Sequence, residues 1–245
     1  MKKIFLLIAI VLGLLATKVN AQQRQTKYGN NVRVYHNRSN TQASPVRFGI
    51  RAGGNLAQWE GETMNSAQDL LDVTDGSVKK QMREGFHIGG YVTIPVIQGF
   101  EIEPGLQYSQ KGTKLTGKVP IEAVDFLNTN VTITNKAEYI DLPVLARVYV
   151  GEGFNIFAGP QVSYLVSNKV KAEAGALGFN ALNKEWNMNS GFRQVDVAVT
   201  GGLGYRFTNG FNVSAGYDYG LSTVDANGSF DTYNRVVKAS LGYTF

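Results

Sequence analysis

The sequence contains no cysteine and only two histidines, His36 and His87. Without cysteine the chain can form no disulfide, and no lipid can be attached to a cysteine at a cleavage site. Two histidines do not provide a cluster with metal-ligand spacing, so we expect no metal and no cofactor. Because no G-x-S-x-G or comparable nucleophile context occurs, we also expect no catalytic residues and no enzymatic activity.

Charged residues are scarce, at 18 % of the 245 residues. The formal net charge is +5, but three of the lysines lie within residues 1–21. The remaining 224 residues carry 21 basic and 19 acidic side chains, which leaves a net charge of +2. So small an excess does not support binding to nucleic acid, and we expect no nucleic acid partner.

The longest apolar run begins near the amino terminus. Lys2 and Lys3 precede the apolar residues 4–15, and small residues follow. This order is typical of a secretory signal peptide, and we predict that residues 1–21 are removed on export. An uncleaved membrane anchor is the alternative, although the run is short for a helix that spans a bilayer. Residues 22–45 are polar without an apolar period and predict a flexible periplasmic leader.

From Val46 onward, apolar and polar residues alternate with a period close to two, which is typical of strands with two different faces. The alternation predicts eight strands, at about 46–57, 84–97, 99–112, 137–150, 154–169, 193–208, 211–222 and 233–245. They are longer than the ~9–11 residues that cross a bilayer at a tilt. We therefore expect them to project past the bilayer on one side.

The connections between these strands alternate strictly between short and long. Residues 97–99, 151–153 and 208–210 are tight turns that contain glycine. The long connections span 58–83, 113–136, 170–192 and 223–232. Two of them, 58–83 and 170–192, have some helical spacing and predict short amphipathic helices or an exposed recognition lid. Antiparallel strands in even number, with short turns at one end and long loops at the other, are typical of a bacterial outer-membrane barrel.

The two faces of the strands differ in a way that separates membrane barrels from soluble ones. In the last two strands, Val213 and Leu241 lie on an apolar face, whereas Asp218 and Lys238 lie on a face of Gly, Ser, Thr and isolated charges. A soluble barrel would place its apolar face inside, but a polar face suits a narrow bore within a lipid-facing wall. We predict that residues 46–245 form an all-β, eight-stranded antiparallel up-and-down transmembrane β-barrel, with short periplasmic turns and long extracellular loops.

Five basic and five acidic residues point into the bore in this assignment. Unpaired charges there would be costly, so we expect ion pairs that fill the lumen and leave no open channel. The predicted barrel-interior charge network consists of Arg47, Arg51, Glu101, Glu103, Asp141, Arg147, Asp196, Arg206, Asp218 and Lys238.

Aromatic residues gather near the predicted strand ends, as expected at two membrane interfaces. The chain closes on Leu241-Gly242-Tyr243-Thr244-Phe245, an alternating strand that ends in an aromatic residue. A carboxy-terminal strand of this kind is typical of outer-membrane barrels. We expect Tyr243 and Phe245 to act as the C-terminal assembly signal, through which the barrel-assembly machinery binds.

Residues from about 46 to 245 resemble the PorT-like outer-membrane β-barrel family of Bacteroidetes-type bacteria. Three stretches carry the resemblance: YIDLPVL at 139–145, FAGPQVSYL at 157–165 and DVAVTGGLGY at 196–205. The resemblance implies an eight-stranded barrel in the outer membrane of a Gram-negative bacterium and leaves the role open. Pro143 and Pro160 are unusual within strands and predict a bulge or a local ladder defect.

These observations favour an integral outer-membrane protein with a structural, binding or assembly role. It would contact outer-membrane lipid and display its extracellular loops to a protein partner from a plugged barrel. One alternative is a narrow porin that passes small solutes or ions. The other is a soluble secreted β-barrel that binds a hydrophobic ligand.

Overall fold

The computed structural model describes residues 45–62, 78–118, 130–176, 179–188, 191–226 and 231–245, and every structural statement below concerns these residues. All of them belong to one compact unit, residues 42–245. The predicted signal peptide and nearly all of the predicted leader therefore lie outside the described residues.

The described residues form strands separated by short connections. Their bounds are β1 (Arg47–Glu60), β2 (Val78–Gln81), β3 (Arg83–Ile97), β4 (Phe100–Lys118), β5 (Asn130–Val150), β6 (Phe154–Ala176), β7 (Phe179–Asn187), β8 (Val195–Arg206), β9 (Phe211–Thr223) and β10 (Tyr233–Thr244). No helix among these residues is long and apolar enough to cross a membrane.

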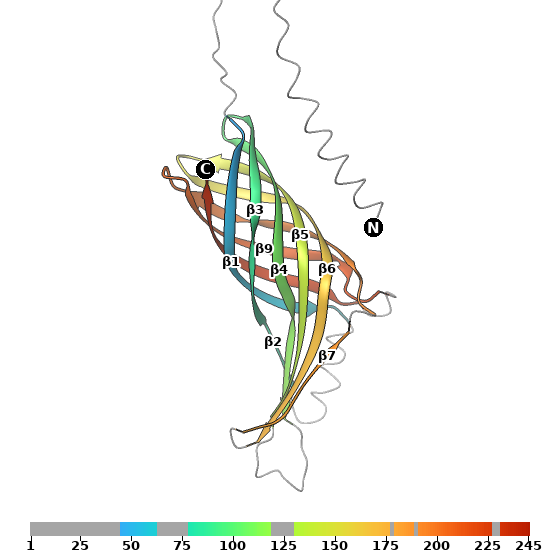
Figure 1. Ribbon diagram of the computed structural model, residues 1–245. Coiled ribbons are helices and arrows are strands. Elements are labelled where there is room, and N and C mark those ends of the chain that lie inside the picture. The colour runs from blue at the N-terminus through green and yellow to red at the C-terminus, as the bar shows by residue number, and fades with distance from the viewer. Residues whose placement is uncertain (1–44, 63–77, 119–129, 177–178, 189–190, 227–230) are drawn as a thin grey trace, which may run out of the picture. The chain divides into compact units, whose positions relative to one another are not determined.

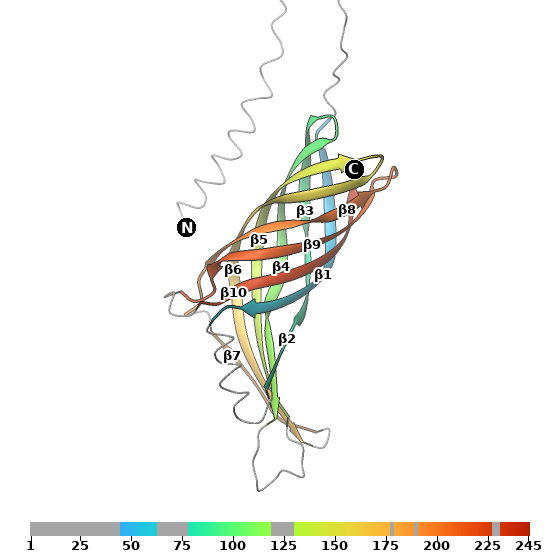
Figure 2. The ribbon, with the colours of Figure 1, turned by 180° about the vertical axis from the view of Figure 1, so that it is seen from behind.

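Eight of the strands close into a ring. The order β4-β3-β1-β10-β9-β8-β6-β5 is completed by pairing of β5 with β4, and every pair is antiparallel. Closure depends on β1 and β10, which pair from Gly49↔Thr244 to Glu60↔Tyr233. Figures 1 and 2 show the ring from opposite sides. A closed sheet of this kind leaves no unpaired strand edge within the ring, and the predicted eight-stranded architecture is confirmed.

Three short turns connect strands at one end of the ring. Gly99, Gly151 and Gly210 adopt φ values of 80°, 73° and 91° in these turns, a conformation that glycine reaches without a Cβ clash. The carboxy terminus lies at the same end, while the longest strands extend at the other (Figure 1). The prediction of tight glycine-bearing turns is confirmed.

The strands β4, β5 and β6 are longer than predicted, and β7 lies where a loop was expected. Residues 170–192 were expected to be a loop with helical spacing, but β6 continues to Ala176 and β7 pairs with it antiparallel. The reason is that Ala172 and Ala174 recur with the strand period of two, with charged residues between them. The helix expected within 58–83 would fall mostly on 63–77, outside the described residues.

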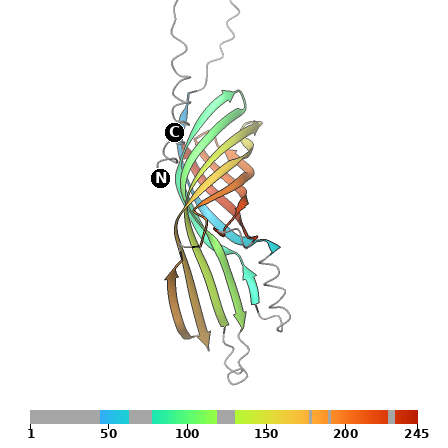
Figure 3. The ribbon, with the colours of Figure 1, turned by 90° about the vertical axis from the view of Figure 1, so that its right-hand side faces the viewer.

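Together these extensions form what we call the projecting sheet. It contains β2, β7 and the ends of β4, β5 and β6 beyond the ring, approximately residues 113–118, 130–136 and 168–176. β2 pairs with β4 at one edge and β7 pairs with β6 at the other. Figure 3 shows this sheet bending away from the ring.

The faces of the ring strands follow the predicted alternation. Val197, Val213 and Leu241 are 38 %, 39 % and 68 % exposed, whereas Asp196 and Asp218 are 3 % and 2 % exposed. The apolar face is therefore the outer wall and the polar face lines the bore, as the sequence predicted.

The two prolines in the resemblance segments lie in a locally interrupted ladder. Pro143 pairs with Gln161, but the β5–β6 ladder resumes only at Ala146↔Ala158, without a change of register. The register shift between these strands lies at Glu138 and Tyr139 instead. The expectation of a ladder defect near Pro143 is confirmed, whereas a bulge at the proline itself is not observed.

Candidate functional site

The bore is the most distinctive site because charged side chains replace an apolar core. Glu103 and Lys111 from β4 are each 1 % exposed, and Asp141 from β5 is fully buried. They are inward because they occupy alternate positions on strands whose other face is apolar. Within the ring these charges fall into two clusters, one near the short turns and one farther along the bore.

The cluster near the short turns contains four arginines and two glutamates. We call it the mouth cluster, and it consists of Arg47, Arg51, Glu101, Glu103, Arg147 and Arg206.

Each glutamate of the mouth cluster holds more than one arginine. Glu101 pairs with Arg47 through Oε1 and with Arg206 Nη1 at 2.8 Å through Oε2. Glu103 Oε1 pairs with Arg51 and, at 3.1 Å, with Arg147 Nη2. Sharing of this kind fixes four guanidinium groups around two carboxylates, with geometry that favours strong charge-assisted hydrogen bonds.

Aromatic rings support the same arginines from the side. Arg51 lies 4.3 Å from the centroid of Tyr91, and Arg206 lies 5.0 Å from that of Tyr149. The hydroxyl of Tyr149 also donates to Glu101 Oε2 at 2.9 Å. Cation–π contacts stabilise the guanidinium groups without consuming carboxylate oxygens.

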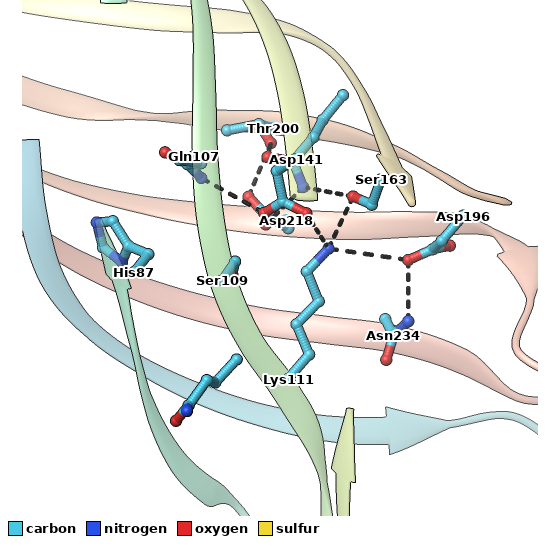
Figure 4. Close-up of polar contacts among 12 residues, drawn as sticks. His87, Gln107, Ser109, Lys111, Asp141, Ser163, Asp196, Thr200, Asp218 and Asn234 are labelled. Atoms are coloured by element: carbon cyan, nitrogen blue, oxygen red, sulfur yellow. Dashed lines mark hydrogen bonds and ion pairs between the residues drawn. The ribbon is translucent and has the colours of Figure 1, made fainter. Parts of the chain in front are cut away.

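The second cluster lies deeper in the bore, and we call it the central cluster. It consists of Lys111, Asp141, Asp196, Asp218 and Lys238. Lys111 Nζ lies 3.0 Å from Asp141 Oδ1 and 4.0 Å from Asp196 Oδ2. Lys238 Nζ lies 2.5 Å from Asp218 Oδ2 and 3.6 Å from Asp141 Oδ2. Figure 4 shows Lys111 reaching between carboxylates that come from different strands.

Neutral polar groups complete the hydrogen bonding of the central carboxylates. Asp196 accepts hydrogen bonds from Ser222 Oγ at 2.7 Å and from Asn234 Nδ2 at 2.9 Å. Asp218 accepts from Thr200 Oγ1 at 2.7 Å and from Gln161 Nε2 at 3.1 Å. These hydrogen bonds satisfy the buried carboxylate oxygens, so the central cluster and its neutral neighbours form one connected unit across the bore.

A buried histidine joins β3 to β1 and β10 within the bore. His87 Nδ1 lies 2.7 Å from Asn55 Oδ1, and His87 Nε2 lies 2.8 Å from Ser240 Oγ. Asn55 Nδ2 donates to the backbone oxygens of Phe86 and Gln110, so its Oδ1 is left to face the histidine. This fixes the tautomer with hydrogen on Nδ1.

The arrangement of Ser240, His87 and Asn55 has the order of groups found in hydrolytic triads. However, the adjoining cavity measures about 30 Å³, and Thr200 and Lys238 also line it. A cavity of that size holds a water molecule but no acyl substrate. The geometry therefore fits a polar core, and within the described ranges no group of His, Asp and Glu is arranged to hold a metal ion.

The structure places all ten residues of the predicted charge network in the bore, where each forms an ion pair or a hydrogen bond with another side chain. Sequence reasoning missed Lys111, although it shares the alternation of Glu101 and Glu103 and was therefore detectable. Of the predicted assembly signal, Phe245 is 68 % exposed and its ring lies 5.2 Å from that of Tyr243.

The projecting sheet is a second candidate surface. Ile133 and Trp186 are 43 % and 41 % exposed there, and Lys169 Nζ pairs with Glu185 Oε1 at 2.9 Å. The hydrogen bond between these two side chains raises the pKa of Lys169 and lowers the pKa of Glu185. Exposed aromatic residues such as Trp186 are enriched at surfaces that contact other proteins.

A closed antiparallel ring with an apolar outer wall and a charged bore defines the class of outer-membrane β-barrels. The chain matches the family described as the outer membrane protein beta-barrel domain over residues 20–226, and it belongs to this family. No curated protein matches the chain in sequence.

Several solved outer-membrane proteins are similar to the chain. Ail, the attachment invasion locus protein of Yersinia pestis, is 12 % identical, with 82 % of this chain and 99 % of that chain covered and a TM-score of 0.42. Neisserial surface protein A is 14 % identical, with coverage of 81 % and 97 % and a TM-score of 0.43. OprG from Pseudomonas aeruginosa is 13 % identical, with coverage of 82 % and 94 % and a TM-score of 0.31.

Proposed function

We propose that this outer-membrane protein is a barrel with a closed bore that displays the projecting sheet outside the cell to a protein partner. The filled bore carries the proposal, because charged and polar side chains from all eight ring strands interlock across it. The cavity beside His87 has a volume of only about 30 Å³. A role in binding, structure or assembly fits this interior better than solute passage, and no catalytic step is proposed.

In this proposal the short turns face the periplasm and the projecting sheet faces outward. Residues 1–21 direct export, and the strand that ends in Tyr243 and Phe245 engages the barrel-assembly machinery. The outer wall contacts outer-membrane lipid. The resemblance to PorT-like barrels supports the same location, and nucleic acid is not a proposed partner.

Conductance of the purified protein in planar lipid bilayers tests the closed bore. We expect the native chain to give no steady open channel. The double variant Glu103→Ala, Arg147→Ala removes both side chains of a buried ion pair and should let ions pass through the bore. Val197→Ala on the outer wall should not. A steady channel from the native chain would favour the narrow porin and refute the closed bore.

Cell fractionation tests the remaining alternative, a soluble secreted barrel. We expect the chain to stay in the outer-membrane fraction and to require detergent for extraction. Recovery as a detergent-independent soluble protein would overturn the membrane assignment.

The orientation can be tested cleanly because the chain contains no cysteine. Lys184→Cys places one thiol on β7, and Thr208→Cys places one in a short turn. A membrane-impermeant maleimide should label Lys184→Cys on intact cells and Thr208→Cys only after the outer membrane is opened. The reverse pattern would place the projecting sheet in the periplasm and refute the display proposal.

A further inference from the structure

The mouth cluster and the central cluster differ in charge balance. In the mouth cluster, four arginines face two glutamates, which leaves a net charge of +2. In the central cluster, two lysines face three aspartates, which leaves −1. The excess positive charge of the bore is thus concentrated at the end near the short turns.

The protein acceptors at the mouth are already engaged. Both oxygens of Glu101 and Oε1 of Glu103 hold guanidinium groups, and Tyr149 donates to Glu101 as well. Each guanidinium has five N–H donors, so donors far outnumber acceptors. Among the described residues, none accepts a hydrogen bond from the buried Nε atoms of Arg47, Arg147 and Arg206.

Excess positive charge and unpaired donors are costly to bury, so an added acceptor would stabilise this cluster. Guanidinium groups match the two-oxygen geometry of carboxylate and phosphate groups, which they bind in a bidentate manner. A chloride ion or a single water molecule offers no such pair of oxygens. The chemistry of the cluster therefore selects an oxyanion.

The exposed part of the cluster lies at the short-turn end. The side chain of Arg47 is 34 % exposed at the start of β1, and Arg206 is the last residue of β8. Deeper in the bore, Glu103 and Arg147 have side chains that are 1 % and 8 % exposed. An anion can therefore contact Arg47 and Arg206 first, while the deeper arginines attract it electrostatically.

We propose that the mouth cluster binds an oxyanion, a phosphate or carboxylate group, which enters from the short-turn side. In the orientation proposed above this side is the periplasm. The site does not depend on the projecting sheet, so it can exist whether or not that sheet binds a partner.

Thermal unfolding of the full chain in uncharged detergent tests the site, with phosphate or acetate replacing chloride at constant ionic strength. We expect saturating phosphate or acetate to raise the midpoint by about 5 °C, the shift of a domain of this size at roughly 100-fold above Kd. A larger response to phosphate identifies a phosphate group as the ligand, and a larger response to acetate identifies a carboxylate. An unchanged midpoint when chloride is replaced by either oxyanion would overturn the proposal.

Two variants with opposite expected effects on anion binding separate binding from general stability. Arg47→Gln removes one guanidinium and its positive charge, so we expect it to need about tenfold more anion for the same shift, which corresponds to ~1.4 kcal/mol. Glu101→Gln frees Arg47 and Arg206 and raises the net charge, so about tenfold less anion should suffice. Loss of overall stability alone would not produce that gain.

Arg193→Gln is the matched control, because it removes the same charge near the opposite rim, where Arg193 donates to Thr223. It should keep the native response to anions. If Arg193→Gln and Arg47→Gln weaken the response equally, the effect is long-range electrostatics and the proposal is wrong. If Glu101→Gln fails to strengthen the response, the mouth cluster is not the binding site and the proposal is equally wrong.

Discussion

Lys111 and Asp141 face each other in the middle of the bore, with Nζ 3.0 Å from Oδ1 and side chains that are 1 % and 0 % exposed. Few ion pairs in proteins are so completely removed from water, and such pairs are retained only when both charges are satisfied. Lys111 also donates to Ser163 Oγ at 2.9 Å, so its ammonium group has partners on several strands. Lys111 therefore links β4 to the adjacent strand β5 through Asp141, to β6 through Ser163 and to β8 through Asp196.

We expect Lys111→Met to lower the free energy of unfolding by about 3–5 kcal/mol, because it leaves Asp196 buried without its cation and leaves Asp141 with Lys238 at 3.6 Å. Urea-induced unfolding from lipid vesicles measures this change. Lys169→Met is the control, since it removes an exposed lysine whose partner Glu185 stays in water, and it should change stability little.

The double variant Lys111→Met, Asp141→Leu should recover part of the loss, because the uncompensated charge is removed as well. If the double variant is less stable than Lys111→Met alone, the pair does not act as a unit and the account of the central cluster is wrong.

Gly53 and Gly54 are neighbours on β1 that face opposite ways. A Cβ at Gly53 would lie 2.0 Å from the backbone oxygen of Ala239 and 2.6 Å from His87 Cε1. A Cβ at Gly54 would have no atom of the described residues within 4 Å. We expect Gly53→Ala to cost about 1–3 kcal/mol by overpacking the bore. Gly54→Ala should be neutral or slightly stabilising. Equal effects in unfolding experiments would contradict the close packing between β1 and His87.

Arg235 is held on the outside of the ring near the long loops. Its guanidinium lies 3.7 Å from the centroid of Tyr219, and Nη1 donates to the backbone oxygen of Gly220 at 2.8 Å. Lysine keeps the charge but cannot stack or form the same fork of hydrogen bonds. We expect Arg235→Lys to cost about 1–2 kcal/mol.

Arg193→Lys is the comparison for this prediction, because Arg193 donates to Thr223 and forms no ring contact among those found in the described residues. It should cost less than Arg235→Lys when both are unfolded in urea. A larger loss for Arg193→Lys would show that stacking on Tyr219 contributes little.

The sequence predicted the ring and its faces because the period of two survives along each strand. Residues such as Asp218 and Lys238 were assigned inward from alternation alone, which needs no knowledge of neighbours. Which charges meet was not predictable, because pairing depends on register and on the stagger of distant strands. Arg47 and Glu101 are a pair of this kind, separated by 54 residues.

The projecting sheet was missed for a different physical reason. The predicted strands ended before β4, β5 and β6 do, although the alternation continues through Ala172 and Ala174 to the end of β6. β7 is stabilised by partners such as Val170↔Trp186, which only pairing with β6 brings together. Lys111 was also missed, although it lies within the predicted strand 99–112 and its parity with Glu103 marked it as inward.

The outer wall can be tested at Leu203, which is 50 % exposed and lies between Ile156 and Ala215 on the neighbouring strands. We expect Leu203→Arg to lower the free energy of unfolding in lipid vesicles by about 2 kcal/mol or more, because a charge must enter the apolar membrane. Thr208→Arg adds the same charge in a short turn and should have little effect. If Leu203→Arg were as stable as Thr208→Arg in vesicles, the exposed apolar face would not contact lipid, and the soluble alternative would regain support.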